Sequence, residues 1–140
     1  MNKKVRFIKP IKHEKRNWGS EILLAVVPKK YSLKKLIMKA GTKGGLQYHH
    51  KKNECGYILS GKLLIRFDNG SGKLNEKILS QGDSFQFPPG AVHQEEALTD
   101  CEIIEVSTPF FNDRVRVEKK YGLVDDEGLP STKIEEVIEK

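Results

Sequence analysis

Cysteine is scarce in this sequence: the 140 residues include only Cys55 and Cys101. Their spacing fits neither a disulfide framework nor a Cys-x-x-Cys metal site, so we expect two reduced thiols. Long hydrophobic runs are also missing. The longest uninterrupted apolar stretch is Ile22 to Val27, far shorter than the roughly 20 residues of a membrane-spanning helix. The charged N-terminus has no apolar segment behind it, unlike a secretory signal. We therefore expect a cytoplasmic protein with no membrane partner.

Acidic residues are outnumbered by basic ones, and the formal net charge is +6. Such an excess can favour an anionic partner. No aromatic-plus-basic stacking pattern and no recognition helix accompany the charge, so we do not expect a nucleic acid. A phosphorylated small molecule and a solvated basic face explain the excess equally well.

Helical periodicity is absent from about Glu21 to Val106. Short runs of β-branched or aromatic residues are separated there by Gly, Pro and Asn, which is typical of an antiparallel sandwich or barrel. The expected strands are Ile22–Val27, Ser32–Lys39, Gln47–His50, Cys55–Leu59, Lys62–Phe67, Leu74–Leu79, Ser84–Phe87, Ala91–Glu96 and Glu102–Val106.

The chain is long enough for one domain with its own core. We expect an N-terminal arm at 1–20, a barrel at 21–110 and a C-terminal helical extension at 111–140. In that extension Thr132 and Glu135 are spaced like a capping box that opens a short helix.

Two segments carry closely spaced Gly, His, Glu and Pro residues, at 41–61 and 82–93. They resemble the two signature motifs of the cupin superfamily. Gly41, Glu54 and Gly61 match the first motif, in which His49 takes the second histidine position and Gln47 stands in place of the first. The second motif is matched by Gly82, Pro88, Gly90 and His93. The resemblance implies an all-β fold, the double-stranded β-helix or jelly-roll barrel.

The same resemblance implies a divalent metal ion held by Gln47, His49, Glu54 and His93. Residues 47 and 49 share one face of a strand, so their side chains can converge on one ion. A second spacing allowed by the family would select Tyr48 and His50 instead; we prefer Gln47 and His49, because a phenolic oxygen is an uncommon ligand. Two imidazoles, a carboxylate and an amide oxygen suit Zn, Mn, Fe, Co or Ni.

A longer resemblance runs from Arg16 to Gly122. The segments at 16–20, 46–54 and 113–122 are similar to the mannose-6-phosphate isomerase domain found at the C-terminus of bifunctional mannose-1-phosphate guanylyltransferases. The sequence departs from that family's pattern at several positions, which are Asn17, Gly45, Lys51, Lys52 and Ala97.

This resemblance implies a metal-dependent aldose–ketose isomerase that acts on a sugar phosphate in carbohydrate or surface-polysaccharide metabolism. Glu95 and Glu96 are the two candidates for the catalytic base: Glu95 shares its strand face with His93, and Glu96 occupies the family's Glu position. The candidates for holding the phosphate are Lys35, Lys52 and Arg116.

Two other functions stay open at this point. One is an epimerase or ketoisomerase that acts on a nucleotide-linked sugar, and the other is a non-catalytic sugar-binding module. We expect a homodimer, because pairing through a barrel edge hides unpaired strand groups and the long N-terminal arm could serve that purpose.

Overall fold

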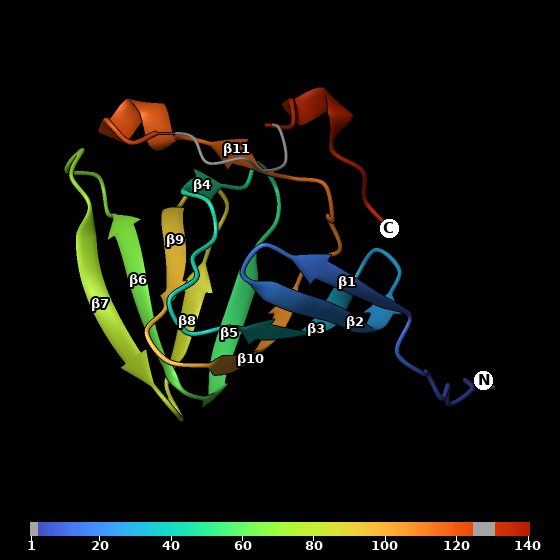
Figure 1. Cartoon of the computed structure of the whole chain (residues 1–140). Coiled ribbons are helices and arrows are strands. Elements are labelled where there is room, and N and C mark those ends of the chain that lie inside the picture. Colours follow the sequence, from blue (N-terminus) through green and yellow to red (C-terminus); the bar gives the residue numbers. More distant parts are fainter. Residues whose placement is uncertain (1–2, 125–130) are drawn as a thin grey trace.

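The fold consists of two antiparallel β-sheets that face each other (Figure 1). The computed structural model describes residues 3–124 and 131–140. The six-stranded sheet contains, in spatial order, β1 (Lys12–Arg16), β2 (Gly19–Val27), β3 (Tyr31–Met38), β10 (Cys101–Ser107), β5 (Glu54–Ser60) and β8 (Ser84–Phe87). The five-stranded sheet contains β11 (Val115–Arg116), β4 (Gln47–Tyr48), β9 (Val92–Ala97), β6 (Lys62–Asp68) and β7 (Asn75–Ser80). This is the all-β jelly-roll architecture expected from the sequence.

Side-chain alternation along the strands builds the interior. On β3 every second residue from Ser32 to Met38 is buried, and β5 and β10 repeat this pattern. The interior has two different ends. The closed end is apolar, with Leu36, Met38, Ile58 and Ile103 in its core. At the other end the same inward positions carry polar and charged side chains, which are Ser32, Lys34, Glu54, Glu105 and Ser107.

The C-terminal part of the chain crosses the open, polar end of the barrel (Figure 1). β11 adds to the five-stranded sheet by pairing with β4. Two short 3-10 turns follow, Glu118–Tyr121 and Ile134–Glu136. The expected C-terminal helix is therefore reduced to single turns. The capping box does not form, because the Thr132 hydroxyl donates to the Asn112 carbonyl and the Ile134–Glu136 turn has no side-chain cap.

Every strand expected from the sequence is present, with ends shifted by a few residues. Two strands were not predicted. β1 has the sequence KHEKR, which lacks any hydrophobic alternation, and it forms because it pairs with β2 from Lys12 to Arg16. β11 is only two residues long.

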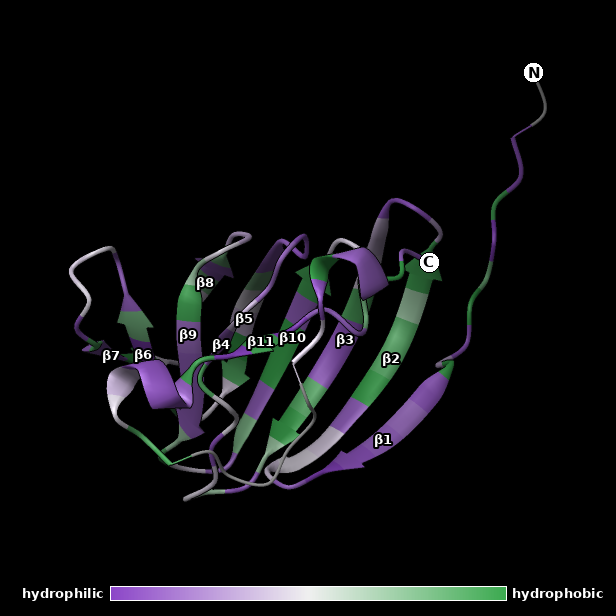
Figure 2. Cartoon of the chain, turned by 90° about the horizontal axis from the view of Figure 1, so that it is seen from above, coloured by the Kyte–Doolittle hydropathy of each residue, from purple (hydrophilic) through white to green (hydrophobic). Residues whose placement is uncertain are grey.

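The described residues before β1, from Lys3 onward, extend away from the body of the molecule (Figures 1 and 2). Phe7 and Val5 in this arm are 95% and 81% exposed. Both cysteines are free, Cys101 being buried and Cys55 exposed on the outer face of β5. In the part of the chain that the structure describes, no helix has the length and apolar character needed to cross a membrane.

Candidate metal centre

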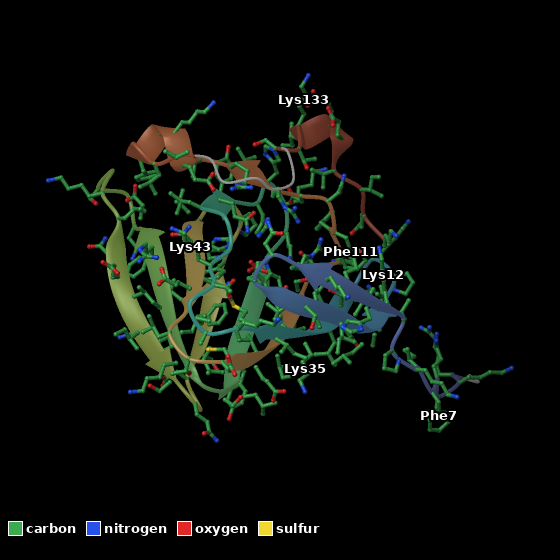
Figure 3. All side chains as sticks on the ribbon, in the orientation of Figure 1. Phe7, Lys12, Lys35, Lys43, Phe111 and Lys133 are labelled. Carbon is green, nitrogen blue, oxygen red and sulfur yellow. The ribbon has the colours of Figure 1, made fainter. Side chains whose placement is uncertain are left out.

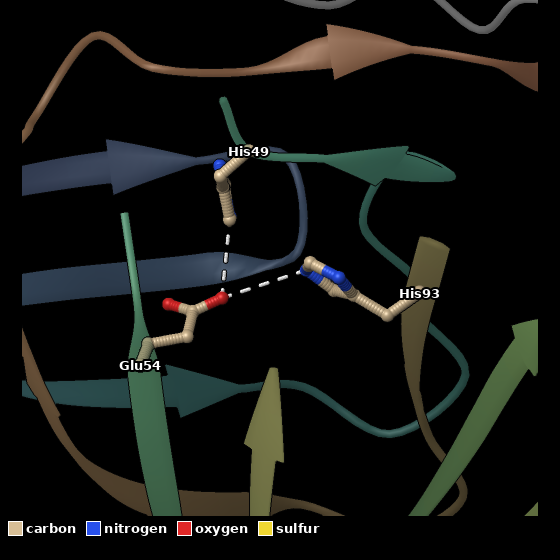
Figure 4. Close-up of side chains that lie close together, drawn as sticks. All are labelled: His49, Glu54 and His93. Carbon is tan, nitrogen blue, oxygen red and sulfur yellow. Dashed lines mark hydrogen bonds and ion pairs between the residues drawn. The ribbon is translucent and has the colours of Figure 1, made fainter. Parts of the chain in front are cut away.

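Three side chains from three different strand regions meet inside the polar end of the barrel (Figure 4). His49 follows β4, Glu54 begins β5, and His93 lies in β9. The ligand atoms of the three residues all lie within 4.8 Å of one another, and all three side chains are buried. Glu54 Oε1 is 3.2 Å from His49 Nε2 and 3.5 Å from His93 Nε2.

Backbone carbonyls orient both imidazole rings. His49 Nδ1 donates to the Asp113 carbonyl, and His93 Nδ1 donates to the Ala91 carbonyl at 2.9 Å. These bonds place a proton on Nδ1 of each ring, and Nε2 of each ring points into the site. His93 is also stacked on Phe87, with ring centroids 3.8 Å apart. Burial lowers the pKa of His93 to about 4, against the opposing charge of Glu54, so the ring is neutral at pH 7.

Glu54 keeps its negative charge although it is buried. Burial would raise the pKa of this carboxyl, but the Lys52 ammonium 3.0 Å from Oε2 and the two histidines hold it well below its usual range. Lys52 also lies 3.3 Å from Glu105 Oε1. Burial would lower the pKa of Lys52, and the charges of Glu105 and Glu54 raise it instead. Glu54 is therefore an ionised candidate ligand, with Oε1 directed at the two histidines and Oε2 at Lys52.

The arrangement fits a divalent cation. Two imidazole Nε2 atoms and one carboxylate oxygen face one another. His93 Nε2 is buried and has no hydrogen-bond partner among the described residues. A buried imidazole nitrogen that has no partner and faces a buried carboxylate is costly unless a cation lies between them. Two imidazoles and a carboxylate are ligands that first-row divalent metals accept, and the Nδ1–H contacts to carbonyls are the usual outer support of such ligands.

Gln47, the fourth predicted ligand, lies beside this group. It is directly opposite His93 in the β4–β9 register and lines the same cavity. His50, which follows His49, is directed elsewhere: its Nε2 donates to the Thr132 carbonyl at 2.7 Å. This bond ties the C-terminal segment to one side of the open end of the barrel.

The candidate ligands lie in a cavity of about 680 Å³ at the open end of the barrel. Glu95 lines this cavity on the same side of β9 as His93, and its Oε2 is buried with no hydrogen-bond partner among the described residues. Burial, together with the charges of Glu105 and Glu54, raises the pKa of Glu95 well above its ordinary value. Glu96 is on the opposite side of β9, where its Oε1 accepts from Arg66 Nη1 at 2.7 Å.

The three predicted phosphate-binding cations lie in three different environments. Lys35 is outside the cavity and forms an ion pair with Glu102 at 3.3 Å (Figure 3). Lys52 is inside, committed to the two buried carboxylates described above. Arg116 lines the cavity and donates through Nε to both oxygens of Glu118, at 3.1 and 3.0 Å. A Cβ on Gly45 would lie 2.6 Å from Arg116 Nε, so the glycine found where the resembled family has Ser leaves room for this guanidinium.

Several functional residues were missed by sequence reasoning. Asp113 is 2% exposed and accepts the backbone N–H groups of residues 50, 51 and 52, so it fixes the turn between His49 and Glu54. Lys34 lies opposite Glu105 in the β3–β10 register and pairs with Glu21. The available signal was the strand alternation: Lys34 and Glu105 are charged residues at inward positions of strands whose inward residues are otherwise uncharged.

Comparison with known proteins agrees with this geometry. The family model described as a cupin domain matches residues 35–107, which include all four candidate ligands. The chain belongs to the cupin family. Its expected membership of the cupin superfamily is therefore confirmed.

Solved structures that resemble this cupin differ widely in size. The capsular polysaccharide assembling protein CapF from Staphylococcus aureus is 26% identical, with a TM-score of 0.68 over 79% of this chain and 32% of that protein. Two further structures share the fold. KdgF from Halomonas sp. is 19% identical, with a TM-score of 0.59 over 69% of this chain and 86% of that protein. Oxalate decarboxylase from Bacillus subtilis is also 19% identical, with a TM-score of 0.70 over 84% of this chain and 34% of that protein.

One curated sequence resembles part of the cupin. A probable germin-like protein, subfamily 2 member 5, from Arabidopsis thaliana is 35% identical over 52 residues, which are 37% of this chain and 24% of the relative. The chain thus spans about a quarter of the length of this relative and about a third of the length of CapF.

Proposed function

We propose that this cupin is a metal-dependent aldose–ketose isomerase that acts on a sugar phosphate. The observation that carries the proposal is the convergence of His49, Glu54 and His93 beside an unpartnered carboxyl, Glu95 Oε2, in one cavity. The sequence resemblance to the mannose-6-phosphate isomerase domain supports this reaction. The likeness to a capsular polysaccharide assembling protein supports a place in carbohydrate metabolism.

In this proposal His49, Glu54 and His93 hold one divalent ion, and Gln47 supplies a fourth ligand. The ion is Zn, Mn, Fe, Co or Ni, because the donors are nitrogen and oxygen. When bound, such an ion polarises a sugar carbonyl and its neighbouring hydroxyl and so lowers the cost of an enediolate. Lys52 keeps Glu54 ionised, and the carbonyls of Asp113 and Ala91 keep both Nε2 atoms directed at the site.

Glu95 is the base that we assign. It removes the proton from C2 of the aldose and returns it to C1 of the enediolate, while the proton of the C2 hydroxyl passes to O1, so the carboxyl ends the reaction in its starting state. Its raised pKa suits this work, because a carboxyl that holds a proton closer to neutral pH both accepts and returns it readily. Glu96 is less suited, since it is paired with Arg66 on the other side of the strand.

The test is an assay of the purified protein, loaded with Mn, Zn or Co, on mannose 6-phosphate and other hexose and pentose phosphates. We expect ketose formation that is lost in His93→Gln and reduced at least about 100-fold in Glu95→Gln. Glu96→Gln is the matched control on the same strand and should keep its activity. Turnover that survives both His93→Gln and Glu95→Gln would refute the proposal.

The second candidate is an epimerase or ketoisomerase for a nucleotide-linked sugar. The observation in its favour is again the 26% identity to the capsular polysaccharide protein over 79% of this chain. Activity on a nucleotide-linked keto sugar by metal-free protein would select this candidate. Sugar binding without any turnover would instead select the non-catalytic module.

We also propose that the cupin forms a homodimer and is cytoplasmic. Support for the dimer comes from the arm, whose Val5 and Phe7 are almost fully exposed, and from the outer face of the six-stranded sheet, where Tyr57 and Val106 are 43% and 44% exposed. A second copy of the chain would cover both apolar surfaces. Light scattering should give the mass of a dimer for the full chain and of a monomer after deletion of residues 1–11. A monomeric full chain would contradict this proposal.

A further inference from the structure

The cavity is lined by seven lysine and arginine residues, and most of the buried ones have acidic partners. Lys34 Nζ pairs with Glu21 at 2.5 Å, Arg16 Nε lies 3.3 Å from the same carboxylate, Lys52 pairs with Glu54 and Glu105, and Arg116 pairs with Glu118. These ion pairs neutralise the cations that a sequence-based search would choose for an anionic ligand.

Arg114 differs from the other buried or half-buried basic residues of the cavity. It is half-buried and lines the cavity, but its guanidinium has no hydrogen bond or ion pair with any residue in the described ranges 3–124 and 131–140. Its backbone is fixed, because the Arg114 carbonyl accepts the Thr132 N–H at 2.7 Å and the chain then enters β11. The side chain therefore extends into the cavity from a rigid position.

Among the described residues, positive neighbours act on Arg114 more strongly than negative ones do. Burial, followed by the like charge of Arg16, lowers the pKa of this guanidinium, while Glu21 attracts it less strongly than Arg16 repels it. A half-buried guanidinium that has lost hydration and gained no carboxylate is unfavourable. An anion with two oxygens in one plane would supply the missing partner, because the guanidinium fork can donate to both.

We propose that Arg114 binds the anionic group of the ligand at the mouth of the cavity, a phosphate or a carboxylate on a sugar-derived molecule. Only the choice of a sugar-derived ligand rests on the proposed function. Two exposed lysines that also line the cavity, Lys15 and Lys43, add positive charge to the entrance. Figure 3 shows Lys43 near β4 and β9 at this end of the barrel.

The experiment measures binding, not turnover. Titration calorimetry with metal-loaded protein uses four probes: mannose 6-phosphate, glucuronate, inorganic phosphate and uncharged mannose. The variants are Arg114→Met, which keeps the length of the side chain without its charge, and Arg114→Lys, which keeps the charge without the fork. Lys77→Met is the matched control, because Lys77 is exposed on β7 and does not line the cavity.

We expect Arg114→Met to weaken binding of at least one anionic sugar by about 10-fold or more and to leave the dissociation constant for mannose unchanged. Arg114→Lys should lie between Arg114→Met and the wild type. The anionic sugar that loses more affinity identifies the group, phosphate or carboxylate. Metal affinity and melting temperature should not fall in Arg114→Met, since the arginine forms no ion pair within residues 3–124 and 131–140.

The inference is overturned if Arg114→Met binds both anionic sugars as tightly as the wild type, or if it weakens mannose to the same extent. It is also overturned if the wild type binds neither anion more tightly than mannose. An inactive protein that binds anions through Arg114 would refute the isomerase alone. An active protein whose anion binding ignores Arg114 would refute only this inference.

Discussion

Asp113 connects the stability of the barrel to the metal centre. Its Oδ1 accepts the His50 N–H at 2.9 Å, and its Oδ2 accepts the N–H groups of Lys51 and Lys52 at 2.6 and 2.9 Å. Its own backbone carbonyl accepts from His49 Nδ1. Burial would raise the pKa of this carboxyl, but the three N–H donors lower it. We predict that Asp113→Ala destabilises the protein and weakens metal binding at the same time.

The magnitude follows from the three hydrogen bonds. Each bond to a charged acceptor contributes about 1.5–3 kcal/mol. Lys51 is exposed and His50 half-buried, so their N–H groups can regain water, whereas Lys52 is buried. We therefore expect a loss of about 3–4 kcal/mol in the free energy of unfolding, less than three full bonds. Asp113→Asn keeps at most one acceptor oxygen and should lie between the alanine variant and the wild type.

Metal affinity should fall by about 10- to 100-fold in Asp113→Ala, because the turn that carries His49 loses its anchor. Urea unfolding measures the first effect and calorimetric titration with Zn or Mn measures the second. Asp100→Ala is the control: among the described residues, Asp100 accepts one backbone N–H through its side chain, that of Ala40, at an exposed position. It should cost about 1 kcal/mol or less and leave metal binding unchanged.

The pH dependence provides an independent check on Asp113. A depressed pKa in the folded state stabilises the protein above the pKa of the unfolded chain, and that contribution is lost as the pH falls. The difference in stability between the wild type and Asp113→Ala should therefore be full above about pH 5 and shrink below about pH 4. The reasoning is refuted if Asp113→Ala unfolds within about 1 kcal/mol of the wild type and binds metal equally well.

Three further predictions concern other parts of the molecule. Removing the metal with a chelator should lower the free energy of unfolding by about 3 kcal/mol if the free ion was at 100 times its dissociation constant, and thermal melts should show no such effect in His93→Gln. Lys52→Met leaves the buried Glu54 and Glu105 without the Lys52 ammonium. Urea unfolding should show that the free energy of unfolding falls by about 3–5 kcal/mol. A change as small as that of Lys77→Met would contradict this interpretation. The Tyr121 hydroxyl donates to Asp68, which raises the pKa of this phenol to about 12. An ultraviolet titration should therefore show one tyrosine that ionises at higher pH than the others and is absent from Tyr121→Phe. Four tyrosines that ionise together would exclude this bond.

The strands of this cupin could be predicted because they bury one face. Alternation along β3, β5 and β10 is written directly in the sequence, and Gly and Pro mark the turns between strands. β1 could not be predicted in the same way, since its KHEKR sequence has no apolar face. It is held by its register with β2 and by the ion pairs of Arg16 with Glu14 and Glu21. Charged edge strands of this kind depend on a neighbour that lies elsewhere in the sequence.

The C-terminal helix was predicted from a local pattern that tertiary contacts override. Thr132 has the spacing of a capping residue, but its hydroxyl donates to the Asn112 carbonyl and its backbone N–H to the Arg114 carbonyl. The segment is thereby tied across the mouth of the barrel. A capping box requires the Thr132 hydroxyl to accept from the N–H of Glu135, and the Glu135 side chain to accept from the Thr132 N–H; here the hydroxyl and the N–H of Thr132 both have other partners.

The ligand set and the substrate-binding residues differ in how much a sequence can say about them. His49 and Glu54 belong to one short segment, and their spacing limits how far apart they can lie. Whether a cation is available for a ligand depends instead on its distance from acids on other strands. Arg116 occupies a motif position of the isomerase domain that the sequence resembles, but it contacts Glu118. Arg114, outside that motif, lines the cavity with no acidic partner among the described residues. Charge compensation is a property of the folded chain, so the anion-binding residue had to be found in the structure.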